Sequence, residues 1–164
     1  MISRTGTHAL KALVMLHALA PGSYAGAAQV AREIRAPSNY LGKLLRQLAR
    51  AGIVEGRKGS NGGFRLAAGR RSVALYDALQ PFEHFELLAR CLLGRPKCLH
   101  SSPCRAHEGW AHVRDTYLDF LKKTTLPELA ESQAPGARRK SGPSKSAAQN
   151  PRSIAARPAA GGVR

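Results

Sequence analysis

Acidic residues are scarce in this chain, which holds ten Asp and Glu against 26 Lys and Arg and has a formal net charge of +16 at pH 7. Such an excess of positive charge favours a polyanionic partner, most often nucleic acid. A basic tail accounts for part of it, since residues 133–164 contain seven Lys and Arg and no acid. The other 19 basic residues still outnumber the ten acids, so the rest of the chain is itself basic.

Long apolar runs are also missing, because no segment approaches the roughly 20 apolar residues that a membrane-spanning helix needs. The first six residues, 1–6, lack the order of charged and apolar segments that is typical of a signal peptide. We therefore expect a cytoplasmic protein with no membrane partner, in which thiols stay reduced. The chain has only three cysteines, and this odd number argues against a closed disulfide framework.

Sequence fingerprints of catalysis are absent too. The glycines of residues 59–63 could suggest a nucleotide-phosphate loop, but neither a Lys-Ser/Thr pair nor a helix follows them directly. There is no flavin or nucleotide fingerprint and no motif with paired catalytic carboxylates. We expect neither an enzyme nor a small-molecule substrate.

Residues 3–52 predict three helices. Apolar residues recur every three or four positions from about Ser3, a plausible N-cap, to Leu19, and again over residues 27–34. A third helix, capped by Ser38 or Asn39 and closed by Gly52, turns four leucines inward. Two short helices joined by a turn indicate a helix-turn-helix, although a small bundle with a solvated basic face has the same pattern. We expect major-groove contacts from the outward face: Ser38, Asn39, Tyr40, Lys43, Arg46 and Gln47.

A predicted β-hairpin directly after the third helix favours the DNA-binding interpretation. Residues 53–57 and 64–66 read as short strands around a Gly-rich turn. A hairpin in this position is a wing, and its glycines allow close approach to a groove or phosphate chain. The expected wing contacts with the minor groove or backbone are Arg57, Lys58 and Asn61.

The C-terminal half predicts a helix over residues 72–85, which Pro81 ends or kinks, and a long helix over residues 106–124. The long helix carries an apolar seam that favours a dimer, with packing on its own domain as the alternative. The seam consists of Trp110, Val113, Tyr117, Phe120 and Leu121. We therefore expect a mainly α fold with a small β-hairpin wing. Its predicted parts are a winged helix-turn-helix domain (1–86), a cysteine loop with a dimerisation helix (87–130) and a disordered basic tail (131–164).

All three cysteines lie in one stretch, at Cys91, Cys98 and Cys104, and His107 follows. Thiolates select zinc, copper(I) or iron–sulfur clusters. Structural zinc sites use ligand pairs two to four residues apart, and only Cys104 with His107 fits that spacing. Zinc and redox-active thiols without a metal remain open, as does a small iron–sulfur electron carrier.

The order of these features resembles the IscR/NsrR family of winged-helix iron–sulfur regulators over about residues 1–130. The matching stretches, beside the cysteine trio, are residues 8–13 in the first helix, 38–41 at the start of the recognition helix, 57–64 in the wing and 124–129 after the long helix. The wing motif and the cysteines in this order are together specific, whereas each alone is weak.

The resemblance implies a homodimeric, DNA-binding repressor or activator, with a repressor favoured, whose binding to a double-stranded operator is controlled by an iron–sulfur cluster. The cluster would sense redox state, nitric oxide or iron–sulfur supply. Its thiolate ligands would be Cys91, Cys98 and Cys104, although the first gap holds six residues where the family often has five. His107 matches the histidine of the IscR branch, which favours [2Fe–2S] over [4Fe–4S]; His8 is the alternative fourth ligand.

Overall fold

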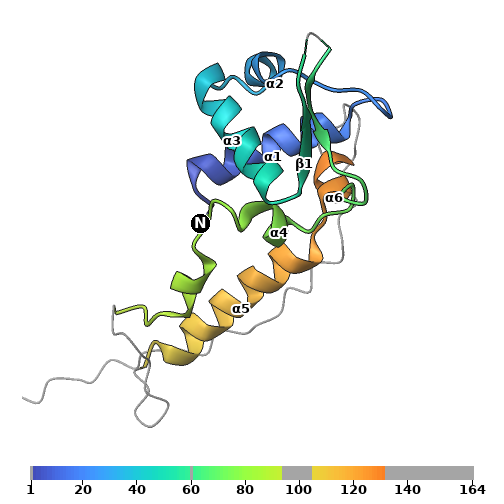
Figure 1. Cartoon of the computed structure of the whole chain (residues 1–164). Helices are drawn as coiled ribbons and strands as arrows, with labels where there is room; N and C mark the ends of the chain where they lie inside the picture. The colour runs from blue at the N-terminus through green and yellow to red at the C-terminus, as the bar shows by residue number, and fades with distance from the viewer. Residues whose placement is uncertain (1, 60, 94–104, 132–164) are drawn as a thin grey trace, which may run out of the picture.

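The computed structural model describes residues 2–59, 61–93 and 105–131, and Figure 1 shows their arrangement. A helical domain with a projecting hairpin lies at one end, and a long helix extends away from it. The elements in chain order are α1 (Arg4–His17), α2 (Ala27–Glu33), α3 (Ser38–Arg50), β1 (Val54–Arg57), β2 (Gly63–Leu66), α4 (Leu75–Leu79), the 3-10 helix η1 (Phe85–Ala89), α5 (His107–Lys123) and α6 (Leu126–Glu131). The expected mainly α fold with a β-hairpin wing is confirmed.

Helix α1 begins where the sequence predicts. The Ser3 hydroxyl accepts a hydrogen bond from the Gly6 backbone N–H at 3.0 Å and so satisfies one of the donors left unpaired at the helix start. The side chains of one α1 face are buried, among them Ala9, Leu13 and Leu16. This face makes α1 the centre of the domain core.

Helices α2 and α3 pack together as the predicted helix-turn-helix, with Arg35 at φ 55° in the turn. The prediction that Ser38 or Asn39 caps α3 is wrong, because Pro37 is the N-cap and its carbonyl accepts from Leu41 N at 3.0 Å. Proline holds φ near −65° and can stand directly before a helix in an extended conformation. Ser38 and Asn39 consequently lie in the first turn of α3 with exposed side chains.

The wing is the antiparallel hairpin of β1 and β2, with Val54 opposite Leu66 and Glu55 opposite Arg65. Ala25, just before α2, adds a short bridge to Phe64 through two backbone hydrogen bonds of 3.0 and 2.8 Å. The hairpin is thereby tied to the helix-turn-helix as well as to the end of α3. The two elements expected to contact DNA form one unit.

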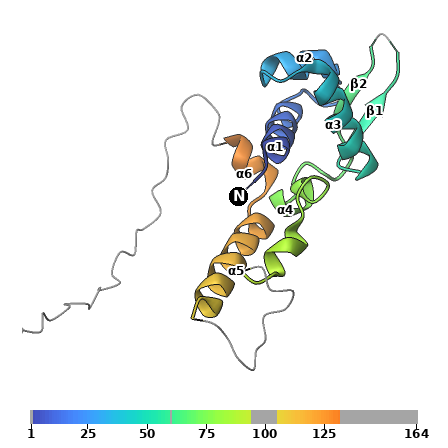
Figure 2. The ribbon, with the colours of Figure 1, turned by 90° about the vertical axis from the view of Figure 1, so that its left-hand side faces the viewer.

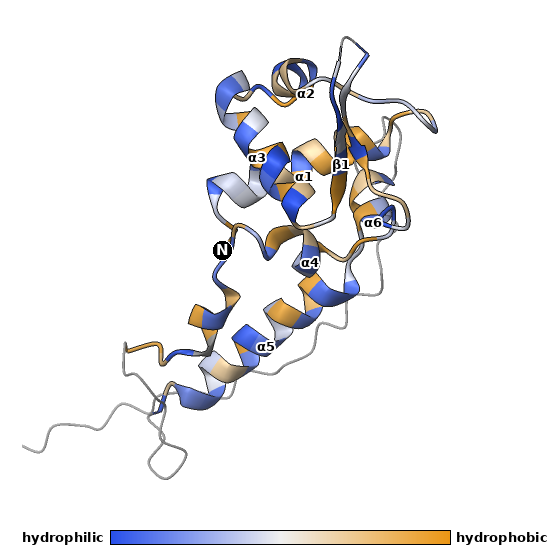
Figure 3. Cartoon of the chain, viewed as in Figure 1, coloured by the Kyte–Doolittle hydropathy of each residue, from blue (hydrophilic) through white to orange (hydrophobic). Residues whose placement is uncertain are grey.

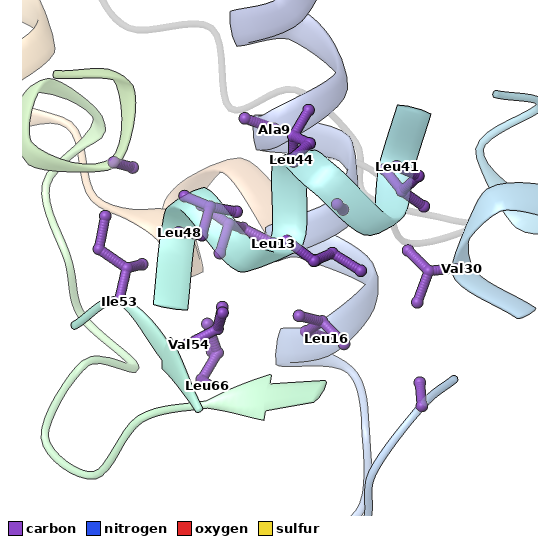
Figure 4. Packing of buried hydrophobic residues seen from close by; sticks show 14 of the residues in the cluster. Ala9, Leu13, Leu16, Val30, Leu41, Leu44, Leu48, Ile53, Val54 and Leu66 are labelled. Carbon is purple, nitrogen blue, oxygen red and sulfur yellow. The ribbon is translucent and has the colours of Figure 1, made fainter. Parts of the chain in front are cut away.

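The core lies between α1, α3 and the hairpin, and it includes the four leucines predicted to face inward from α3. Figure 4 shows Leu13 of α1 and Leu48 of α3 above Val54 and Leu66 of the strands. Leu13, Leu41, Leu45 and Leu48 are completely inaccessible to solvent. Burial of these side chains supplies about 1.5–3 kcal/mol each, which holds α3 in place under its exposed polar face.

Helix α4 is much shorter than the predicted helix over residues 72–85. Ala74 is extended and bridges to Thr125, and Leu75 N donates to the Thr124 carbonyl at 2.9 Å. Residues before Leu75 thus satisfy their backbone groups with a distant segment instead of a helix. After Leu79 the chain turns, and η1 begins at Phe85, where the predicted helix was expected to end, and continues into the segment expected to be a loop.

Helix α5 runs from the far end of the molecule toward the winged domain, and α6 follows it and lies beside α1 (Figure 2). Leu126 of α6 is fully buried in the same cluster as α1, whereas Leu121 of α5 packs with Leu75, Leu79 and Phe85 in a second cluster. The proposed division at residue 86 stays a prediction. Within the described residues, no helix is long and apolar enough to cross a membrane.

Candidate nucleic-acid interface and cysteine segment

The outer face of α3 presents the polar side chains that the sequence assigned to DNA. Ser38, Asn39, Lys43 and Arg46 are exposed, and they border a shallow hollow between α2 and α3. Gly42 and two small residues of α2 also line it, and the absence of larger side chains there leaves room for close approach of another backbone. In Figure 3 the far end of the hairpin is hydrophilic, and α1 and α3 each carry hydrophilic as well as hydrophobic residues.

Three of the predicted base contacts already have partners within the protein. The Arg46 guanidinium donates from Nε to the Gly42 carbonyl at 2.9 Å, which leaves its other N–H groups for a ligand. Tyr40 is half-buried and its hydroxyl lies 3.4 Å from Nδ1 of His8. Gln47 is exposed, but its Nε2 donates to the Pro81 carbonyl at 2.6 Å. Their contacts with bases stay predictions.

The wing exposes Arg57, Lys58 and Asn61, as expected. Arg57 donates from Nη2 to the Asn61 carbonyl at 3.0 Å, across the tip of the hairpin. Its guanidinium carbon also lies 4.9 Å from the centroid of the Tyr24 ring. Arg57 is therefore held by contacts within the wing and with the segment before α2.

Sequence reasoning missed the cluster around Tyr24. Arg65 also lies over the Tyr24 ring, at 4.7 Å, and forms an ion pair with Glu55, whose carboxylate accepts from the Tyr24 hydroxyl at 3.2 Å. Strand alternation could have predicted that Glu55 faces Arg65 across the hairpin. No local pattern marks Tyr24, because its partners lie 31 or more positions away.

The described ends of the cysteine segment are held close together. Cys91 follows η1 with 7% of its surface exposed, and His107 is the first residue of α5. The Trp110 indole N–H donates to the Arg90 carbonyl at 3.1 Å, so the first turn of α5 lies beside the residue preceding Cys91. Cys98 and Cys104 lie outside the described residues. Among the described ones, no three His, Cys, Asp or Glu side chains gather as metal ligands, and the predicted four-ligand set stays a prediction.

The turn between α4 and η1 connects the cysteine segment with the winged domain. Glu83 accepts hydrogen bonds from the Ser3 backbone N–H at 2.9 Å and the Ser3 hydroxyl at 2.6 Å, both at the start of α1. Two residues earlier, the Pro81 carbonyl accepts the bond from Gln47 of α3. The segment leading to Cys91 is thus bonded to both α1 and the recognition helix.

Several large apolar side chains remain exposed near this segment and along α5, where Figure 3 shows hydrophobic colour. Val113 and Phe120 are each more than half exposed and stand seven residues apart, on one face of α5. In the part of the chain that the structure describes, the other exposed large apolar residues are Leu87, Leu92 and Leu93. In contrast, Tyr117 and Leu121 of the predicted seam pack within the chain.

Comparison with known proteins identifies the family. The family Rrf2, described as an iron-dependent transcriptional regulator, matches residues 2–132. The chain belongs to the Rrf2 family. This is the family of the IscR and NsrR regulators, so the resemblance seen in the sequence is confirmed.

The Rrf2 relatives are transcription regulators and not enzymes. One of them, named as an HTH-type transcriptional regulator of Aquifex aeolicus (strain VF5), is 30% identical over 131 residues, covering 79% of this chain and 90% of the relative. Another, from Neisseria meningitidis serogroup A, is 31% identical over 98 residues, which cover 60% of this chain and 66% of the relative. This Rrf2 chain is accordingly an HTH-type, DNA-binding transcription regulator.

Solved structures agree with the winged-helix fold of Rrf2 regulators. CymR, the global cysteine regulator of B. subtilis, superposes with a TM-score of 0.68 at 23% identity, covering 80% of this chain and 97% of CymR. The IscR protein of T. potens gives a TM-score of 0.64 at 20% identity, covering 80% and 87%. At these identities the likeness concerns the fold alone.

Proposed function

We propose that this Rrf2 protein is a homodimeric repressor whose operator binding is controlled by an iron–sulfur cluster that senses redox state, nitric oxide or iron–sulfur supply. The proposed ligands are Cys91, Cys98, Cys104 and His107, with [2Fe–2S] favoured over [4Fe–4S]. One observation carries the proposal: the hydrogen bond from Trp110 to the Arg90 carbonyl closes the segment whose two ends are Cys91 and His107.

The donor chemistry of the two described ligands fits such a group. When bound, a cluster held by three thiolates and one imidazole supplies a redox centre whose potential is higher than that of an all-thiolate site. Burial of Cys91 limits its exposure to solvent, and the position of His107 at the start of α5 links the segment to the proposed dimerisation helix. Binding or loss of the cluster at Cys91 and His107 would therefore act on η1 as well as on α5.

Two contacts supply a route from the cysteine segment to DNA. Gln47 bonds the recognition helix to Pro81, and Ser3 bonds α1 to Glu83, within a turn that leads through η1 to Cys91. A state of the segment that moves this turn shifts the position of α3. Control of DNA binding requires such a difference in contacts between two states.

The exposed apolar face of α5 supports the homodimer. Val113 and Phe120 lie on one face and are spaced by one heptad, as in a helix seam that packs against a second copy. A two-fold dimer presents two recognition helices to two half-sites, so each chain needs to supply only one recognition helix, α3.

A thiol switch without a cluster is the competing function, because cysteines can be oxidised without any metal. Reactive cysteines are typically accessible and lie in electropositive surroundings. Only 7% of the surface of Cys91 is exposed, so it is a poor candidate for direct attack by an oxidant. A zinc site is the second competitor.

The deciding experiment is anaerobic purification of the full chain, followed by its absorbance spectrum and its iron, sulfide and zinc content. We expect iron with equal sulfide in the wild type, loss of both in Cys91→Ser, a changed spectrum in His107→Ala, and retention in the control His8→Ala. Operator binding, measured at one salt concentration, should differ between the loaded and cluster-free protein. Zinc alone, no metal, or equal operator binding by the two forms would contradict the proposal.

A further inference from the structure

The wing carries two arginines that lie over the same aromatic ring but differ in their ion pairing with Glu55. Arg57 and Arg65 both lie over the ring of Tyr24, at 4.9 and 4.7 Å from its centroid. Residues 55, 57 and 65 share one face of the hairpin, because side chains alternate along each strand and Glu55 stands opposite Arg65. Only Arg65 forms an ion pair with Glu55.

From this geometry we propose that Tyr24, which lies outside both the recognition helix and the hairpin, is a positioning residue for DNA binding. Its ring holds the guanidinium of Arg57 in place beside the wing tip, where Arg57 contacts a DNA phosphate next to the contact made by Lys58. Arg65 has a structural role: its charge is neutralised by Glu55, and it makes no phosphate contact.

The position of Tyr24 is itself well determined. Its neighbour Ala25 is bonded to Phe64 of β2 through both backbone groups, and the Tyr24 hydroxyl donates to the Glu55 carboxylate of β1. The ring is thus attached to both strands of the hairpin. A cation over the face of an aromatic ring is attracted by the ring quadrupole, so Tyr24 restricts the guanidinium without neutralising it.

The second support for Arg57 comes from the tip. Its Nη2 donates to the Asn61 carbonyl at 3.0 Å, which uses one of five N–H donors and leaves the others for a phosphate. The side chain is exposed and otherwise costs rotamer entropy when it is immobilised on DNA. Holding it in place beforehand reduces that cost, which is how Tyr24 would increase affinity without touching DNA.

The test uses the full chain in one cofactor state and a duplex that the wild type selects from a random-sequence pool, with affinity measured across a salt series. Removing a phosphate contact lowers the slope of log affinity against log salt by about 0.9. We expect that loss for Arg57→Ala, and an unchanged slope for Arg65→Ala, which is the matched control. Equal slopes for these two variants would overturn the assignment of Arg57 as the phosphate contact.

The role of Tyr24 is tested by Tyr24→Leu, which keeps apolar bulk without the ring. We expect affinity to fall by about two- to fivefold at every salt concentration with the slope unchanged. Tyr24→Phe, which keeps the ring, should remain close to the wild type. A loss in Tyr24→Phe as large as in Tyr24→Leu would show that the hydroxyl carries the effect, and would overturn the proposal.

A double-mutant cycle separates positioning from general damage. Tyr24→Leu should have no further effect in an Arg57→Ala background, because the group it positions is gone. In a Lys58→Ala background its full effect should persist, since Lys58 is the adjacent wing base and is not over the ring. Loss of fold would weaken both backgrounds equally, so additive effects in the Arg57→Ala background overturn the proposal. These measurements involve no cysteine, so their outcome is independent of whether the protein binds an iron–sulfur cluster.

Discussion

At the residue scale, Gly63 limits what the wing can tolerate. Its backbone has φ +148°, and a Cβ built there would lie 2.5 Å from the carbonyl oxygen of Ala25 and 2.6 Å from its carbon. Only glycine avoids both the unfavourable dihedral and the clash. The bridge between Ala25 and Phe64, which joins the hairpin to the helix-turn-helix, therefore depends on this one residue.

Gly63→Ala should reduce the free energy of unfolding by about 1–3 kcal/mol, because the new methyl group forces the backbone away from Ala25. Gly22→Ala is the matched control, since Gly22 also has a positive φ but has no atom within 4 Å of a built Cβ. Its cost should be close to the dihedral penalty of about 1 kcal/mol. Urea denaturation of both variants measures the difference, and equal costs would contradict the role of the close approach.

Single residues also show which local signals can be trusted. Ser3 and Gly52 behave as predicted, the first as an N-cap and the second with φ +68° after α3. The predicted cap of α3 was wrong, because three adjacent residues, Pro37, Ser38 and Asn39, are all acceptable near a helix start. Choosing between them needs the path of the chain from α2, which the local sequence does not contain.

At the element scale, α6 is a short helix maintained by its cap and by burial of Leu126. Glu128 accepts hydrogen bonds from the Thr125 backbone N–H at 2.6 Å and from the Thr125 hydroxyl at 2.8 Å. The carboxylate of a capping box stabilises the orphan donors at a helix start in this way. The backbone N–H and the hydroxyl lower the pKa of Glu128, in that order of importance.

This lowered pKa gives a pH dependence with a definite sign. Because the folded chain favours the charged carboxylate, the contribution is present above the ordinary carboxyl pKa and is lost as pH falls through the lower, folded-state value. Glu128→Gln should therefore lower the Tm near neutral pH, and the difference from the wild type should shrink in acid. Glu33→Gln, on the exposed surface of α2, controls for removal of one negative charge; a pH-independent difference in Glu128→Gln would refute the assignment.

The predicted helix boundaries were wrong where two segments that are distant in the sequence pair through their backbones. The periodicity of residues 72–85 suggested one helix, yet Ala74 pairs with Thr125 and only residues 75–79 are helical in α4. The same pairing places Leu126 in the core beside α1. Hydrogen bonds between residues about fifty positions apart cannot be inferred from a periodic pattern, because the pattern reports only on residues a few positions apart in the sequence.

At the scale of the whole molecule, the exposed apolar face of α5 is a surface that the described residues leave uncovered. Replacing both Val113 and Phe120 by Ser should shift the protein from dimer to monomer, because their exposed surface is the part of the helix available to a second copy. Loss of the dimer separates two half-site contacts and should lower operator affinity by at least tenfold. Analytical ultracentrifugation and operator binding measure both effects.

Asp115→Ser is the control for this pair of substitutions, since Asp115 is exposed on the same helix but, two residues after Val113, lies on its opposite side. It should leave the sedimentation coefficient and the operator affinity unchanged. A double variant that still sediments like the wild type would show that the apolar face of α5 is not the dimer interface, and the homodimer would then need another surface.

The amino-acid sequence alone was sufficient for the order of helix, helix-turn-helix and wing, and for the outward polar face of α3. Those features follow from periodicity, turn residues and caps, which are interactions among residues a few positions apart. Only the tertiary structure decided where α4 begins and ends, that α6 packs against α1, and that Arg57 and Arg65 lie over the ring of Tyr24. Each of these is a contact between distant segments, whose partners are chosen by packing of the whole chain.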